Sequence, residues 1–228
     1  ATSSAVSAAL NKQWRSKVVN DTYEPGSTFK AVVLAAALEE GVVSESDTFY
    51  CPGYTVVNGT RIACSDTSGH GSQTLREAVQ NSCNPAFIEI GQRLGAEKFY
   101  EYFETFGMTE VTGVDLIGET KGLAWTEDYF TSAEGYLSLA TASFGQRFTT
   151  TPIRMITAFA ATINGGYLYQ PYVVDRISDS EGNLIRQTEP TVVRQTVSEA
   201  TSAHTSEILE SVVSEGTGGN AYVEGYRG

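Results

Sequence analysis

A nearly all-apolar run of Ala, Val and Leu extends from Thr28 to Glu40 and predicts a buried helix. Pro25 and Gly26 end the loop before it, and Gly41 supplies the usual stop after it. We therefore expect this helix to lie in the core of the protein.

Two more helices are predicted to meet at a tight corner. Thr74 and Glu77 have the spacing of a capping box, which opens a short helix. Asn84 then has the place of an N-cap for a second helix, whose apolar spacing continues to Gly95.

The remainder of the chain mixes helices and strands, with helices in the majority. Caps and apolar spacing predict helices over residues 151–164 and 198–215. Between them we expect strands over 167–177 and 183–188, joined by a hairpin turn at 179–182.

Composition narrows the classes of protein. With 228 residues and 41% hydrophobic content, the chain can bury a sizeable core and suits one domain. The formal net charge of -12 argues against a nucleic-acid partner, because phosphate backbones would repel it. No apolar stretch reaches the ~18 residues of a membrane span, and no signal peptide is visible.

Ser27 and Lys30 lie three residues apart at the start of the first helix, so their side chains share one face. A neutral serine is a weak nucleophile and needs a base within hydrogen-bond reach. Burial on an apolar helix disfavours a charged amine, so a neutral Lys30 can take the Ser27 proton. The alternative is a serine that caps the helix and a lysine that extends to water.

Ser82 and Asn84 lie on the corner between the next two helices, where a hydroxyl and an amide can both point into a cleft. Taken alone, this S-x-N pattern is explained as well by Asn84 acting only as an N-cap. The Ser27–Lys30 pair and the Ser82–Asn84 pair together indicate the function more strongly than either pair does alone.

Together they resemble the penicillin-binding proteins and serine β-lactamases, which combine S-x-x-K, S-x-N and K-T-G. The similarity is greatest to the class B penicillin-binding proteins, the monofunctional peptidoglycan D,D-transpeptidases, including those of sporulation and division. It extends along most of the chain, through segments 23–30, 69–71, 79–88, 144–146 and 151–166.

The resemblance implies an α/β (α+β) fold of the penicillin-binding protein and serine β-lactamase type, here mostly its helical lobe with an incomplete central sheet. It implies that Ser27 is the acylated nucleophile and that Lys30 is its base. Ser82 would relay a proton to the departing amine, and Asn84 would hold Lys30 and the substrate's peptide amide. The backbone N–H of Ser27 would supply half of an oxyanion hole.

The same resemblance implies peptidoglycan stem peptides as substrates, β-lactams as acylating inhibitors, and no cofactor for catalysis. It places the protein outside the cytoplasm, among other cell-wall synthesis proteins, with a membrane anchor upstream of Ala1 in the full-length parent.

One motif of the family is missing. No K-T-G occurs in the 228 residues, and the Thr217–Gly218 pair has no lysine before it. We interpret residues 1–228 as a transpeptidase domain that is truncated or incompletely represented at both ends. We expect little or no acylation from these residues alone.

Other functions compete with transpeptidation. A serine β-lactamase needs fast deacylation, and a β-lactam sensor needs coupling to a signal. Glu24 beside the serine belongs to the family's E-P-G signature and carries no special hydrolytic weight. An inactive scaffold of the cell-wall machinery is the third alternative, which the absence of K-T-G favours superficially.

Three cysteines leave one unpaired if two of them form a disulfide. Cys51 and Cys64 flank a predicted turn at Asn58–Gly59, which could bring them together. The alternatives are free thiols or a closed tetrahedral zinc site with four ligands. The candidate ligands are Cys51, Cys64, Asp66, His70 and Cys83.

Overall fold

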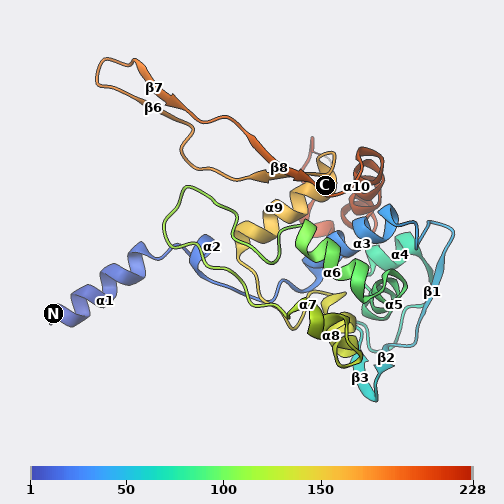
Figure 1. Cartoon of the computed structure of the whole chain (residues 1–228). Coiled ribbons are helices and arrows are strands. Elements are labelled where there is room, and N and C mark those ends of the chain that lie inside the picture. Colours follow the sequence, from blue (N-terminus) through green and yellow to red (C-terminus); the bar gives the residue numbers. More distant parts are fainter. Residues whose placement is uncertain (1, 227–228) are drawn as a thin grey trace.

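The computed structural model describes residues 2–226. At its centre lies helix α3 (Lys30–Glu39), in which every residue from Lys30 to Ala37 is buried. A 3-10 turn, η1 (Gly26–Phe29), precedes it, so the predicted helix begins two residues later as regular α-helix. Four helices pack around α3 (Figure 1), namely α5 (Asn84–Leu94), α6 (Ala96–Thr105), α9 (Pro152–Ile163) and α10 (Glu199–Ser214).

The other predicted helices are confirmed, with one correction at a cap. Thr74 forms the capping box with Glu77, and Thr151 and Ser198 cap their helices through their side chains. Asn84 is the first residue of its helix rather than the N-cap, which is Cys83. The helices besides α3 are α1 (Ser3–Trp14), α2 (Lys17–Asn20), α4 (Leu75–Gln80), α5 (Asn84–Leu94), α6 (Ala96–Thr105), α7 (Glu127–Thr131), α8 (Tyr136–Ala142), α9 (Pro152–Ile163) and α10 (Glu199–Ser214), with 3-10 turns η2 (Ala133–Gly135) and η3 (Gly219–Ala221).

The strands of the described residues form antiparallel pairs. The predicted strand over 167–177 is divided at Pro171, which has no N–H to donate to a ladder. The predicted hairpin at 179–182 is confirmed, and the turn at Asn58–Gly59 also forms. The pairs are β1 (Thr48–Cys51) with β4 (Gly71–Thr74), β2 (Tyr54–Val57) with β3 (Thr60–Ala63), β5 (Tyr167–Gln170) with β8 (Thr191–Gln195), and β6 (Arg176–Ser178) with β7 (Leu184–Gln187).

An aromatic cluster fills the core beside α3. Phe29 is 1% exposed, and its ring contacts Phe148 at a centroid distance of 4.9 Å and Phe103 at 5.9 Å. These edge-on contacts add specific geometry to the burial of large apolar surfaces. The cluster therefore fixes Phe29, the residue directly before Lys30.

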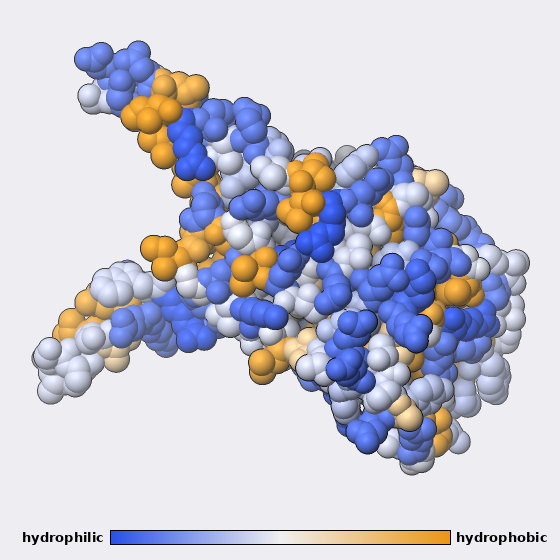
Figure 2. Space-filling model, in the orientation of Figure 1, coloured by the Kyte–Doolittle hydropathy of each residue, from blue (hydrophilic) through white to orange (hydrophobic). Residues whose placement is uncertain are grey.

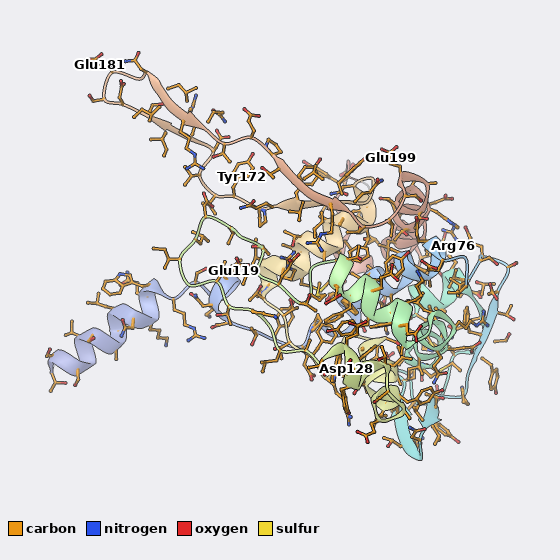
Figure 3. The ribbon with its side chains drawn as sticks, viewed as in Figure 1. Arg76, Glu119, Asp128, Tyr172, Glu181 and Glu199 are labelled. Atoms are coloured by element: carbon orange, nitrogen blue, oxygen red, sulfur yellow. The ribbon has the colours of Figure 1, made fainter. Side chains whose placement is uncertain are left out.

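Two segments project from this body. The helix α1 buries none of its residues, and the β6–β7 hairpin forms an arm with Glu181 at its tip (Figures 1 and 3). Apolar side chains lie exposed along the arm, among them Ile177, Leu184 and Ile185 (Figure 2). Within residues 2–226, we find no helix with the length and apolar character of a membrane span.

Candidate active site

Ser27 lies in the 3-10 turn η1, which directly precedes the N-terminus of α3, and its side chain is exposed. The Lys30 N–H donates to the Ser27 carbonyl, which is the i+3 bond of a 3-10 turn. Residues three apart are eclipsed in such a turn, so the serine and the lysine lie one above the other. Ser27 and Lys30 both line one cleft, which the buried Phe29 does not reach.

The Lys30 amine is buried and held by the corner between α4 and α5. Its Nζ lies 2.6 Å from the Ser82 carbonyl oxygen, 3.0 Å from Ser82 Oγ and 2.8 Å from Asn84 Oδ1. The predicted meeting of Lys30, Ser82 and Asn84 is thus present in the structure. Each of the three N–H groups of a charged Lys30 amine thus has one of these oxygens as its acceptor. The Ser27 hydroxyl is not one of the three acceptors.

Burial lowers the pKa of Lys30 to about 8, against the opposing influence of the nearby Cys83 and Cys64 thiols. About one tenth of the amines with such a pKa are neutral at pH 7. A neutral amine keeps two N–H donors and gains a lone pair, so it can stay bound to Asn84 while accepting a proton. The site therefore contains a base suited to near-neutral pH.

Ser82 has a left-handed backbone conformation, with φ of 49°. A non-glycine residue in this region is uncommon and is held there by its surroundings. Here its N–H donates to Val79, and the N–H of Cys83 donates to Ala78. The Asn84 amide bridges the site, because its Nδ2 donates to the Ala63 carbonyl at 3.1 Å while its Oδ1 receives Lys30.

The loop that carries Ser27 is also held by residues 145–147, a contact that the sequence does not predict. Gly26 N donates to Gly145 O at 2.9 Å, and Arg147 N donates to Glu24 Oε1 at 2.9 Å. Gly145 has φ of 77°, and a Cβ there would lie 2.0 Å from the Gly26 oxygen. Segments 23–30 and 144–146 both belong to the family resemblance, but nothing in the sequence indicates that they contact each other.

These side chains open into a cleft of about 440 Å³. Ser27, Lys30 and Ser82 line the cleft, and α9 and α10 supply much of the remaining lining. The lining is mainly apolar, which keeps the dielectric low around the lysine. The described part of the chain thus places the Ser27 and Ser82 hydroxyls and the Lys30 amine in one cleft, with the Asn84 amide bonded to that amine.

Comparison with known proteins assigns the family. The model of the "Penicillin binding protein transpeptidase domain" matches residues 1–227. The chain belongs to this family. Membership confirms the fold class and the class B resemblance inferred from the motifs.

Two relatives indicate the branch of the family. The chain is 46% identical over 215 residues to "Stage V sporulation protein D" of Bacillus subtilis, covering 93% of this chain and 33% of that protein. It is 28% identical over 223 residues to "Peptidoglycan D,D-transpeptidase FtsI" of Escherichia coli K12, covering 97% and 35%. The chain therefore spans about a third of the length of these curated relatives.

Solved structures of the family have the same fold. The D,D-transpeptidase domain of a peptidoglycan glycosyltransferase from Eggerthella lenta superposes with a TM-score of 0.87 at 28% identity, covering 98% of this chain and 58% of that one. Penicillin-binding protein 3 of Mycobacterium tuberculosis, solved with aztreonam, gives 0.81 at 27% identity, covering 92% and 47%.

The penicillin-binding protein fold also brings together four of the five candidate metal ligands. The ligand atoms of Cys51, Cys64, His70 and Cys83 all lie within 4.8 Å of one another. Cys64 Sγ lies 3.6 Å from His70 Nδ1 and 4.0 Å from Cys83 Sγ. All three cysteines are free thiols, so the structure does not contain the alternative Cys51–Cys64 disulfide.

Asp66 is the fifth candidate, and its carboxylate is bonded within its own loop. Its carboxylate accepts hydrogen bonds from the backbone N–H of Ser68 at 2.9 Å and from Ser68 Oγ at 2.6 Å. It lies outside the four-ligand cluster. A local turn needs this carboxylate, which explains an acidic residue in the loop without a metal.

Proposed function

We propose that the protein is a peptidoglycan D,D-transpeptidase that works through a Ser27 acyl-enzyme. The observation that carries the proposal is the buried Lys30 amine, bound to Ser82 and Asn84 in the cleft that also contains Ser27.

In the first step, neutral Lys30 takes the Ser27 hydroxyl proton while Ser27 Oγ attacks a peptide carbonyl of a donor stem peptide. The peptide C–N bond then breaks, and the proton passes through Ser82 Oγ to the departing amine. In the second step, an amine of another stem peptide attacks the ester, and Ser27 regains its proton. The same serine would open a β-lactam ring and stay acylated.

The Asn84 side chain has the role of positioning Lys30 and the amide of the bound peptide. The backbone N–H of Ser27 donates to the developing oxyanion, an interaction that typically lowers a barrier by about 3 kcal/mol. Catalysis by these groups needs no cofactor.

Intact-mass measurement with benzylpenicillin tests the proposal in the protein as its gene encodes it. We expect a penicilloyl adduct that maps to Ser27 and is lost in Ser27→Ala, with Ser180→Ala on the hairpin arm as the control. Labelling of Ser27→Ala would refute the nucleophile assignment. A protein that never labels would favour the scaffold function.

The lifetime of the adduct separates a transpeptidase from a β-lactamase. Glu24 would be the nearest carboxylate in sequence to activate water, but it accepts the backbone N–H of Arg147. Because this bond already engages the Glu24 carboxylate, we expect slow hydrolysis of the acyl-enzyme. We expect the adduct to survive for hours, whereas loss within seconds would identify a hydrolase.

We further propose a structural zinc ion at Cys51, Cys64, His70 and Cys83. Tetrahedral zinc with ordinary bond lengths separates two sulfurs by about 3.8 Å and a sulfur from a nitrogen by about 3.6 Å. The observed separations of 4.0 and 3.6 Å fit this geometry. The ion would brace the corner that carries Ser82 and Asn84, because Cys83 lies between them.

Elemental analysis of protein purified without added zinc tests the site. We expect one zinc per chain. A clearly lower content, together with two oxidised cysteines, would favour the disulfide instead.

The location of the protein follows from its proposed substrate. Peptidoglycan lies outside the cytoplasmic membrane, so we propose an extracytoplasmic enzyme, anchored by residues upstream of Ala1 and assisted by other cell-wall synthesis proteins. The likeness to stage V sporulation protein D supports a role in sporulation, and the likeness to FtsI supports one in division.

A further inference from the structure

The turn that follows α10 is fastened to the end of α4 by one residue, Gln80. Its Nε2 donates to Glu215 Oε2 at 3.0 Å. Its carbonyl oxygen accepts from both Thr217 N at 3.1 Å and Thr217 Oγ1 at 3.0 Å. We call Gln80, Glu215 and Thr217 the Gln80 clamp. Every contact in it joins residues more than 130 positions apart in the sequence.

The clamp leaves little room for movement. Gln80 is 9% exposed. A Cβ on Gly216, between the two partners of Gln80, would lie 2.8 Å from the Gln80 oxygen and 2.9 Å from its Cα. The turn is also fixed to α10 itself, because Gly218 N donates to Val212 O at 2.9 Å. The backbone of the turn is thus packed directly against Gln80.

Gln80 lies two residues before Ser82, whose left-handed backbone has to be maintained. Ser82 is also the residue whose carbonyl and hydroxyl bind Lys30. On the other side, Thr217 lines the same cleft as Ser27 and Ser82. The clamp therefore connects the strained corner of the cleft with the turn that closes it near α10.

We infer that Gln80 is a positioning residue for acylation: it fixes Ser82 and Thr217 relative to each other across the cleft. It acts through these neighbours and not on the substrate. The inference rests on the proposed acylation of Ser27. A displaced corner would move the Ser82 carbonyl away from Lys30 and slow the chemical step, whereas initial β-lactam binding would change little.

A pair of reciprocal substitutions tests this role. Gln80→Glu places a carboxylate against Glu215 and replaces a hydrogen bond by repulsion. In the double variant Q80E/E215Q, the amide and the carboxylate change places, so the bond can form again. Glu181→Gln at the tip of the arm, away from α4 and α10 (Figure 3), removes one negative charge without touching the clamp.

The first readout is acylation by a fluorescent penicillin, resolved into a binding constant and a rate constant. We expect Gln80→Glu to lower the rate constant about tenfold with the binding constant unchanged, and the double variant to recover to within about twofold of the original protein. An unchanged rate in Gln80→Glu, or no recovery in the double variant, would overturn the inference.

The second readout is hydrogen exchange, which needs no activity. We expect Gln80→Glu to speed exchange in peptides covering residues 81–84 and 216–218 together, with the double variant restoring both. Faster exchange confined to 216–218 would contradict a link to the Ser82 corner. If the original protein does not acylate, the proposed function fails while this comparison still decides whether the clamp holds the corner.

Discussion

Lys30 Nζ lies 2.6 Å from the carbonyl oxygen of Ser82, a residue with a left-handed backbone. The base of the proposed reaction is therefore held by a strained peptide as well as by two side chains. The left-handed conformation of Ser82 turns its carbonyl in a direction that a residue at a regular helix end would not give. The strained backbone therefore directs this acceptor at Lys30.

The lowered pKa of Lys30 predicts how acylation depends on pH. Burial lowers this pKa to about 8, so the amine is mostly charged below pH 7 and mostly neutral above pH 9. Only the neutral form accepts the serine proton. We expect the acylation rate constant for benzylpenicillin to rise from pH 6 to pH 9, with its midpoint near 8. A rate that falls across this range would exclude Lys30 as the base.

Removal of the Asn84 amide is expected to slow acylation. Asn84→Ala removes one of the three acceptors that hold the Lys30 amine in place, and a displaced catalytic group can slow a reaction by about 100-fold. We expect the rate constant to fall about 10- to 100-fold. Asn81→Ala is the matched control, because the Asn81 amide on the same corner bonds Gln73 instead. Equal losses in the two variants would indicate a general disturbance of the corner.

A methyl group at Gly145 is expected to damage the serine loop. In Gly145→Ala, the left-handed conformation costs about 1–2 kcal/mol, and the new Cβ would meet the Gly26 oxygen at 2.0 Å. We expect both a lower free energy of unfolding in urea and slower acylation. Gly182→Ala on the arm has a similar φ of 87° and nothing within 4 Å, so it should show only the conformational cost. Similar behaviour of the two would mean that the loop accommodates the methyl.

The cysteine cluster predicts which loop residues hold zinc. His70→Ala removes one of four ligands, so we expect loss of the metal and a lower melting temperature, because binding stabilises the folded state only. Asp66→Asn keeps the turn bonded to Ser68 and should retain the metal. A chelator should lower the melting temperature of the original protein and leave that of His70→Ala unchanged. Zinc loss in Asp66→Asn alone would reverse the ligand assignment.

The sequence predicted local features well because they depend on neighbouring residues. The capping box at Thr74 and Glu77 and the hairpin at 179–182 were recognisable from short-range hydrogen bonding and turn chemistry. The strand β8 was not, since its partner β5 lies more than twenty positions earlier in the chain. The N-cap assignment of Asn84 was wrong by one position because the tertiary fold uses its side chain to bind Lys30.

By itself, the sequence determined that Ser27 and Lys30 share one face where the buried helix begins, because a spacing of three residues fixes that relation in a 3-10 turn as in an α-helix. It also supplied the thiols and imidazole of a candidate zinc site. Only the tertiary structure decided that Lys30 meets Ser82 and Asn84, that Cys83 joins Cys51 and Asp66 does not, and that Gln80 holds the turn after α10. These contacts join distant parts of the chain, so they depend on how helices pack and not on any local pattern.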